Sequence, residues 1–325
     1  MNIAIIGTGV YGLSMANALA QNKKNNIIMW VESESALKKI ESEKNNIEAL
    51  GGLKLPEKIK FTDSYEVALK DADLVFIMCA AKYLSSVSKD MLPFVNSKMN
   101  FIIGSKGIEQ VTCRFVHEVF LSFINTKNIA VISGPSFAID IAHLEPIGLS
   151  IGYKSIIVLN AAKKAFNGSN IKLRETKDII GIEICGSIKN VIAVAAGILD
   201  GLGYSESTRS FLITESLHDI KELIKVLKGN KKTILSFAGV GDLLLTATST
   251  KSRNYTYGTL LGKKDAVSAE KYLNEYTVEG YYTLKSIYAL LRKKKIKMPV
   301  IDLIYNIIMN NKDPKLLATF LMNKK

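Results

Sequence analysis

The 325-residue sequence predicts an α/β domain built on a doubly wound parallel sheet, followed by an all-α domain. Three observations indicate this fold class. The first half alternates short apolar runs with helical patterns, a glycine-rich turn follows the first run, and the second half carries long helical patterns with few strand-like runs. We therefore expect the sheet domain to span residues 1–180 and the helical domain to span residues 181–325.

Five apolar runs in the first half predict buried strands, since strands covered on both faces lack polar alternation. The strand-like runs are Ile3 to Gly7, Ile27 to Val31, Asp73 to Met78, Asn100 to Ile103 and Ile129 to Ile132. The helical patterns between them are Tyr11 to Gln21, Ser35 to Lys44, Ser64 to Lys70 and Thr112 to Phe123. This alternation is typical of a parallel sheet with helices on both faces.

Apolar residues at helical spacing dominate the second half. The main stretches are Ile182 to Leu199, Thr208 to Val226, Leu284 to Arg292 and Val300 to Met309. Pro299 stands where the last of these begins, and a proline at the first helical position costs little because its missing N–H would be unpaired there. These stretches predict the helical second domain.

The turn Gly7-Thr8-Gly9-Val10-Tyr11-Gly12 joins the first strand-like run to the first helical pattern. In a Rossmann turn the first glycine permits the bend, the second admits a pyrophosphate, and the third allows close packing of helix on strand. Val10 and Tyr11 then stand at the helix N-terminus, which faces the anion. A plain tight turn also uses glycines, but the strand–turn–helix order favours a dinucleotide.

Glu32 follows the second strand-like run, 20 residues after Gly12. An acidic residue at this spacing binds the ribose hydroxyls of NAD and repels the 2′-phosphate of NADP. The alternative is a solvated charge beside Ser33 and Glu34. We therefore expect NAD(H), with NADP(H) as the alternative cofactor.

The composition indicates which ligands and which cellular compartment suit the protein. The net charge is +13, but the lysine clusters are short and scattered, which indicates solvated surface rather than a nucleic-acid site and still favours a small anionic substrate. Three widely spaced cysteines predict no disulfide framework and no metal site, and they fit a reducing, cytoplasmic compartment. The start shows no signal-peptide pattern, and the run Val191 to Leu199 is too short to span a membrane.

Ordered sequence blocks extend this reading along nearly the whole chain. After the glycine turn come Ser105-Lys106-Gly107-Ile108-Glu109, Ser133-Gly134-Pro135-Ser136-Phe137-Ala138, Gly186-Ser187-Ile188-Lys189-Asn190-Val191, Gly239-Val240-Gly241-Asp242-Leu243, Ser252-Arg253-Asn254 and Val278-Glu279-Gly280. Together they resemble the bacterial NAD(P)-dependent glycerol-3-phosphate dehydrogenase family. The resemblance implies reduction of dihydroxyacetone phosphate to sn-glycerol 3-phosphate for phospholipid synthesis. Whether two copies form a homodimer stays open.

The resemblance implies ligand contacts in the loops that follow two strands of the first domain. Lys106 would contact substrate and cofactor, Gly134 and Ser136 the substrate, and Ala138 the cofactor. From the residues alone, Lys106 reads equally as a surface lysine. Ser136 reads equally as a cap of the following helix.

Lys189 is the expected proton donor and acceptor. It lies among Ile, Val, Ala and Gly residues, and burial lowers the pKa of a lysine toward the range of acid–base catalysis. Without the resemblance, a helix-surface lysine is an equal reading. The resemblance adds Asn190 and Thr246 as substrate neighbours and Asp242 as the partner that orients Lys189; Asp242 alone also fits a helix cap.

Ser252, Arg253 and Asn254 are expected to hold the substrate phosphate, because arginine offers a planar fork to phosphate oxygens and its neighbours add donors. By resemblance, Arg253 also contacts the cofactor, together with Val278 and Glu279. Glu279 reads equally as a structural ion-pair partner.

Three departures from the family pattern concern the cofactor and a nearby loop. Cys79-Ala80-Ala81-Lys82 replaces a Val-Pro-Ser-type turn, Glu32 replaces a basic or imidazole side chain, and Ser207 replaces an asparagine. Two other functions share the glycine turn. A β-hydroxyacid dehydrogenase or ketopantoate-type reductase needs no Ser252-Arg253-Asn254 cradle, and a non-catalytic dinucleotide sensor needs no catalytic residues.

Overall fold

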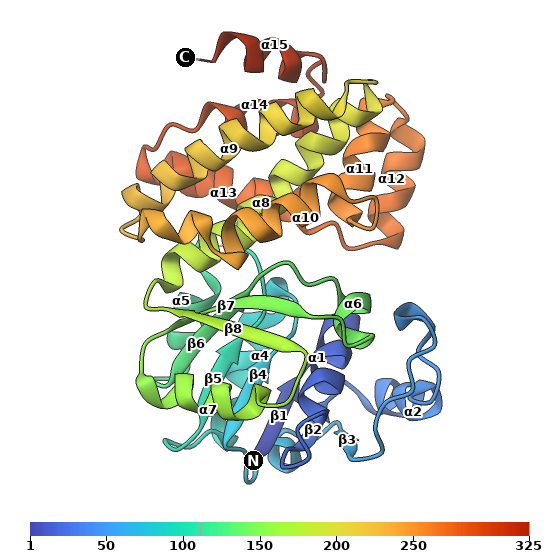
Figure 1. Ribbon diagram of the computed structural model, residues 1–325, viewed down its shortest axis with the longest axis vertical. Coiled ribbons are helices and arrows are strands. Elements are labelled where there is room, and N and C mark those ends of the chain that lie inside the picture. The colour runs from blue at the N-terminus through green and yellow to red at the C-terminus, as the bar shows by residue number, and fades with distance from the viewer. Residues whose placement is uncertain (111, 325) are drawn as a thin grey trace. The chain divides into compact units, whose positions relative to one another are not determined.

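The structure is a computed structural model that describes residues 1–110 and 112–324 (Figure 1). It contains two compact units. The first comprises Met1–Lys106 and Val116–Ile179, and the second comprises Gly107–Phe115 and Ile180–Lys325. The short segment Gly107–Phe115 thus belongs to the second unit, although it lies in the first half of the sequence.

An eight-stranded sheet forms the centre of the first unit, in the order β3-β2-β1-β4-β5-β6-β7-β8. The strands are β1 (Asn2–Ile6), β2 (Asn26–Trp30), β3 (Ile59–Thr62), β4 (Leu74–Ile77), β5 (Asn100–Ile103), β6 (Ile129–Ser133), β7 (Ile147–Tyr153) and β8 (Ile171–Thr176). Strands β1 to β6 are parallel, which confirms the predicted doubly wound sheet for these six.

Strands β7 and β8 extend this parallel sheet in the opposite direction. β7 pairs antiparallel with β6, and β8 pairs parallel with β7, so both run against the other six. The sequence pattern missed these two strands and β3. β3 and β8 are sheet-edge strands with polar residues between apolar ones, and β7 contains two glycines, so none reads as a continuous apolar run.

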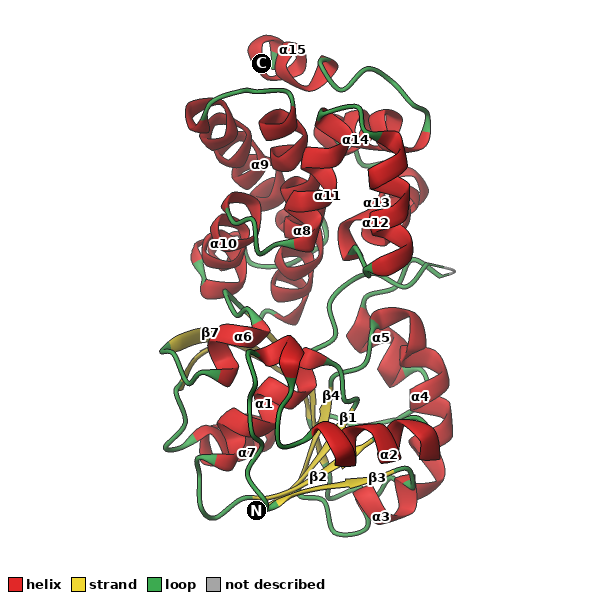
Figure 2. Cartoon of the chain, turned by 90° about the vertical axis from the view of Figure 1, so that its right-hand side faces the viewer, coloured by secondary structure: helices red, strands yellow, loops and turns green. Residues whose placement is uncertain are grey.

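Helices of the first unit cover both faces of the sheet: α1 packs with α7 on one face and α4 with α5 on the other (Figure 2). The helices are α1 (Val10–Ala20), α2 (Glu34–Glu43), α3 (Tyr65–Leu69), α4 (Leu84–Met91), α5 (Val116–Leu121), α6 (Ala138–Ala142) and α7 (Ile156–Phe166). Serine side chains cap three of them: the hydroxyls of Ser33, Ser64 and Ser155 accept from the N–H groups of Ala36, Val67 and Val158, respectively.

The regular secondary structure among the described residues of the second unit is helical, apart from one isolated bridge between Ile108 and Phe115. Its helices are α8 (Ile179–Gly201), α9 (Glu206–Val226), α10 (Asp242–Thr248), α11 (Arg253–Gly262), α12 (Ala266–Glu275), α13 (Glu279–Lys294), α14 (Pro299–Met309) and α15 (Leu316–Asn323). Pro299 occupies the first turn of α14, as predicted. Helix α8 is long and apolar enough to cross a membrane, but 94% of its apolar window is buried inside the protein, as in a core helix.

Helices α8 and α11 run parallel with their backbones in contact. Each carries two glycines four residues apart: Gly197 and Gly201 on α8, and Gly258 and Gly262 on α11. A Cβ atom at Gly258 would lie 2.0 Å from the carbonyl oxygen of Val194, and one at Gly197 would lie 2.0 Å from that of Tyr255. Only glycine fits at this crossing.

Candidate active site

The glycine turn lies after β1, at the carboxyl edge of the parallel strands and next to the point where strand order reverses between β1 and β4. Gly7 has a φ of 115°, which disfavours other residues. A Cβ at Gly12 would lie 2.4 Å from the carbonyl oxygen of Gly7. By contrast, a Cβ at Gly9 would meet nothing within 4 Å, so protein packing does not explain the glycine there.

Helix α1 begins at Val10 and has no side-chain cap, so its N-terminus relies on other partners (Figure 1). This is the arrangement that binds pyrophosphate oxygens in dinucleotide-binding folds. Glu32 is exposed two residues beyond the end of β2, at the same edge of the sheet. Both features fit an adenine dinucleotide.

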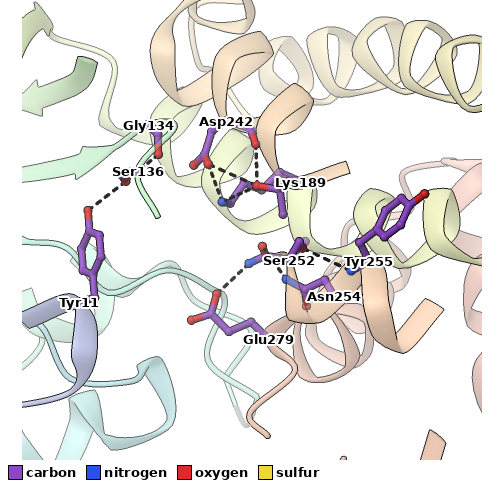
Figure 3. Close-up of polar contacts among 11 residues, drawn as sticks. Tyr11, Gly134, Ser136, Lys189, Asp242, Ser252, Asn254, Tyr255 and Glu279 are labelled. Atoms are coloured by element: carbon purple, nitrogen blue, oxygen red, sulfur yellow. Dashed lines mark hydrogen bonds and ion pairs between the residues drawn. The ribbon is translucent and has the colours of Figure 1, made fainter. Parts of the chain in front are cut away.

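A second group lies at this edge after β5 and β6. Lys106 is half-buried, and its ammonium lies over the ring of Tyr11, 6.0 Å from the ring centroid. The Tyr11 hydroxyl is 3.4 Å from that of Ser136, which in turn donates to the carbonyl oxygen of Gly134 at 2.9 Å (Figure 3). Helix α6 begins at Ala138 with Phe137 as its capping residue, so the reading of Ser136 as a helix cap is wrong.

Lys189 and Asp242 form a buried ion pair in the second unit. The Nζ atom of Lys189 lies 2.6 Å from Oδ1 of Asp242, and their side chains are 9% and 2% exposed. Nζ also donates to the hydroxyl of Thr246 at 3.0 Å. Thr246 in turn donates to the backbone oxygen of Asp242 at 2.6 Å, so three side chains form one cluster on α8 and α10.

The chain segment before Asp242 forms a wide helical turn over Phe237–Gly241. Within it Gly239 has non-helical dihedrals, and a Cβ there would lie 2.1 Å from the carbonyl oxygen of Ile234. Gly241 caps α10, so Asp242 is its first helical residue and not its cap, contrary to the alternative from sequence. A carboxylate in the first helical turn is favoured by the backbone dipoles.

The N-terminus of α11 carries the predicted phosphate cradle. Ser252 is the capping residue, and its hydroxyl accepts from the N–H of Tyr255 at 3.3 Å. Arg253 is exposed in the first turn, and Asn254 beside it is buried. A helix N-terminus with an adjacent guanidinium suits a phosphate group.

Asn190 follows Lys189 on α8 and contacts Asn254 and Glu279. Its carbonyl oxygen accepts from the amide of Asn254 at 3.0 Å, and its own amide donates to Glu279 at 2.8 Å. Val278 is buried as the capping residue of α13, which Glu279 begins. The structure thus brings Asn190, Asn254 and Glu279 into one network.

The chemistry available at these residues is acid–base and anion-binding. No group of three or more His, Cys, Asp or Glu side chains that would hold a metal ion occurs among residues 1–110 and 112–324. Cys79, which follows β4, is partly buried, and desolvation raises the pKa of its thiol to about 11. Its backbone oxygen accepts from the hydroxyl of Ser105 at 2.6 Å. The thiol is therefore protonated at neutral pH.

Comparison with known proteins identifies the family. Residues 2–157 match the family profile of the NAD-dependent glycerol-3-phosphate dehydrogenase N-terminus, and residues 178–319 match that of its C-terminus. The chain belongs to the NAD-dependent glycerol-3-phosphate dehydrogenase family. This confirms the resemblance seen in the sequence.

Individual members of this family align along almost the entire chain. A glycerol-3-phosphate dehydrogenase [NAD(P)+] of Staphylococcus saprophyticus is 33% identical over 95% of this chain and 94% of its own. One of Bacillus subtilis is 34% identical over 95% of this chain and 90% of its own. The crystal structure of the Coxiella burnetii glycerol-3-phosphate dehydrogenase has a TM-score of 0.92 at 29% identity and covers 99% of both chains.

Two residues in the site were not singled out from the sequence. Gly280 donates its N–H to Asn254 at 2.8 Å, and a Cβ there would lie 2.5 Å from the carbonyl oxygen of Asn190. Gly239 shapes the turn before Asp242. A glycine at the second position of a helix, where it costs stability, was the available signal for Gly280.

Proposed function

We propose that this protein catalyses the NAD(H)-dependent interconversion of dihydroxyacetone phosphate and sn-glycerol 3-phosphate. The single observation that carries the proposal is the buried Lys189–Asp242 pair, joined through Asn190 to the N-terminus of α11 with Arg253 and Asn254. It offers a proton donor and a phosphate-binding group on neighbouring helices. Family membership supports the same reaction.

The glycine turn and the edge of the sheet would hold the cofactor. Gly9 supports this, because no protein atom lies where its side chain would stand and a pyrophosphate needs that space. Gly7, Gly12, Val10 and Tyr11 would complete the turn. When bound, the nicotinamide supplies or removes the hydride at the substrate carbon.

Lys189 would transfer the proton. In the direction of reduction its ammonium donates a proton to the carbonyl oxygen of the substrate, and the neutral amine then regains one from solvent. Asp242 and Thr246 hold Nζ in place through contacts of 2.6 and 3.0 Å. The Asp242 carboxylate favours the charged form of the lysine, which is the form that donates.

The substrate phosphate would bind at the N-terminus of α11. Arg253 provides the guanidinium, and Ser252 and Asn254 provide further polar groups. By family resemblance, Lys106, Gly134 and Ser136 would be further substrate contacts, and Lys106 and Ala138 would contact the cofactor. Arg253 and Val278 would contribute further cofactor contacts.

Glu32 would select NAD(H) over NADP(H). It is exposed beyond β2, where a carboxylate accepts hydrogen bonds from ribose hydroxyls and repels a 2′-phosphate. Replacing Glu32 by Arg should raise the ratio of kcat/KM for NADPH to that for NADH at least roughly tenfold. The carboxylate that repels the 2′-phosphate is lost, and a guanidinium that binds it is gained. An unchanged ratio would remove Glu32 from cofactor selection.

We further propose that the protein acts in the cytoplasm. In support, no disulfide joins Cys79, Cys113 and Cys185 in the part of the chain that the structure describes, as is usual in reducing compartments.

The test is the initial rate of NADH oxidation by the purified chain with dihydroxyacetone phosphate, with NADPH in parallel. A substrate-dependent rate that Lys189→Met abolishes without unfolding supports the proposal. Turnover of a 3-keto acid but not of dihydroxyacetone phosphate would support a hydroxyacid dehydrogenase or ketopantoate-type reductase. NADH binding without turnover of either would support a dinucleotide sensor.

A further inference from the structure

A closed series of hydrogen bonds joins three helices of the second unit. The N–H of Gly280 donates to Oδ1 of Asn254 at 2.8 Å, and Nδ2 of Asn254 donates to Oδ1 of Asn190 at 3.0 Å. Nδ2 of Asn190 then donates to Oε2 of Glu279 at 2.8 Å. Because Glu279 and Gly280 are adjacent, the series begins and ends in the first turn of α13.

The two ends of this series determine which way both amides point. A backbone N–H only donates, so the atom of Asn254 that faces Gly280 must be its oxygen. Its nitrogen then faces Asn190, which must present its own oxygen in turn. The nitrogen of Asn190 therefore faces Glu279, whose carboxylate only accepts. Flipping either amide would set donor against donor or acceptor against acceptor.

Close packing holds the series in place. Asn190 and Asn254 are 2% and 8% exposed, so water does not compete for their amides. A Cβ at Gly280 would lie 2.5 Å from the backbone oxygen of Asn190 and 2.9 Å from Oδ1 of Asn254. The first turn of α13 thus approaches α8 and α11 as closely as a backbone can.

We propose that Glu279 is a positioning residue that acts on the substrate side of the reaction. Its carboxylate orients the Asn190 amide, and through it the Asn254 amide, so that each keeps one N–H for the phosphate-bearing substrate beside Lys189 and Arg253. Without that acceptor, Asn190 is able to turn its carbonyl oxygen toward an anion and repel it. This inference rests on the proposed function and differs from a direct contact of Glu279 with the cofactor.

The two roles of Glu279 predict changes in different constants. Orientation of Asn190 needs an acceptor but no charge, and a glutamine carbonyl oxygen supplies one. Contact with cofactor hydroxyls would instead change the affinity for NADH. The comparison is therefore between Glu279→Ala and Glu279→Gln, with Glu206→Ala as the control, because Glu206 also begins a helix and its side chain is 94% exposed.

Three measurements on the full chain separate these roles: KM for dihydroxyacetone phosphate at saturating NADH, Kd for NADH by fluorescence, and Kd for inorganic phosphate by calorimetry. Glu279→Ala should weaken both substrate-side constants roughly 10- to 100-fold, the range for a lost hydrogen bond to a charged group. Glu279→Gln should restore them to within about threefold because its carbonyl still accepts. The Kd for NADH of both Glu279 variants should stay unchanged, and so should all constants of Glu206→Ala. Circular dichroism at the assay temperature checks that every variant is folded.

A change in the Kd for NADH in both Glu279 variants, with substrate constants unchanged, overturns the proposal. So does a loss in phosphate affinity that glutamine does not restore. If the unaltered chain oxidises no NADH with dihydroxyacetone phosphate, the proposed function fails, whereas phosphate calorimetry still tests the amide orientation. Equal phosphate affinity in the unaltered chain and Glu279→Ala would then overturn it.

Discussion

Replacing Lys189 by Met and Asp242 by Asn, singly and together, tests both the stability and the chemistry of the buried pair. Lys189→Met keeps a side chain of similar length and leaves the Asp242 carboxylate without its 2.6 Å partner. Asp242→Asn keeps the shape and removes the charge. The double variant removes both charges and leaves Thr246 in place.

The structure determines the size of the expected effects. With side chains only 9% and 2% exposed, neither charge recovers full hydration when its partner is lost. Breaking a buried pair on one side costs about 3–5 kcal/mol, so Lys189→Met should lower the free energy of unfolding by that amount. Asp242→Asn should cost less, about 1–3 kcal/mol, because the amide oxygen still accepts from the ammonium. The double variant should be more stable than Lys189→Met.

Urea unfolding at neutral pH gives the four free energies and hence the coupling between the two residues. A coupling of about 2 kcal/mol or more is expected for a buried charged pair. Steady-state turnover is the second readout: Lys189→Met should lower kcat by about 10²- to 10⁴-fold, and the double variant should not recover it. A coupling near zero would refute the energetic reasoning. Near-normal turnover of folded Lys189→Met would refute the proton-transfer role.

Three further changes separate folding from ligand binding. Gly9→Ala should leave the melting temperature unchanged, because the φ of Gly9 is −61° and no atom lies within 4 Å of the new Cβ. It should weaken NADH binding at least roughly tenfold, because the methyl group fills the space for the pyrophosphate. Unchanged NADH affinity would contradict this. Gly258→Ala should lower the free energy of unfolding by about 3 kcal/mol, because its Cβ would lie 2.0 Å from the carbonyl oxygen of Val194. Alanine normally stabilises a helix relative to glycine, so a rise in stability would contradict the close helix contact. Alkylation of Cys79 by iodoacetamide should accelerate about tenfold per pH unit from pH 7 to pH 10, since the pKa of its thiol is about 11 and only the thiolate reacts. If the alkylation rate stopped rising below pH 9, the pKa of the thiol would not be raised by burial.

Sequence patterns located the strands that lie inside the sheet and failed at its margins. β1, β4 and β5 are apolar on both faces because helices cover both, so each reads as a continuous run. β8 has polar residues at alternate positions because it is a sheet-edge strand, and β7 is interrupted by Gly148 and Gly152. The reversed direction of β7 depends on its pairing with β6, which no local pattern contains.

The candidate site shows a similar division. The glycine turn was readable from spacing, because backbone geometry demands glycine at defined positions. Lys189 and Asp242 were linked through family resemblance, since their contact spans 53 residues and leaves no periodic trace. The orientation of the Asn190 and Asn254 amides depends on Gly280 approaching from a third helix. Such a three-way contact is a property of packing, not of any one segment.

The glycine crossing of α8 and α11 also fixes the axial register of the two helices. Asn190 pairs with Asn254, Val194 faces Gly258 and Ile198 faces Gly262, so facing positions keep a constant separation of 64 residues. Sliding one helix by a turn would drive Cβ-bearing residues into backbone oxygens. The axial spacing between Lys189, near the middle of α8, and Arg253, at the start of α11, is therefore set by the four glycines of this crossing. Under the proposed function, these glycines set how far a phosphate lies from the carbonyl to be reduced.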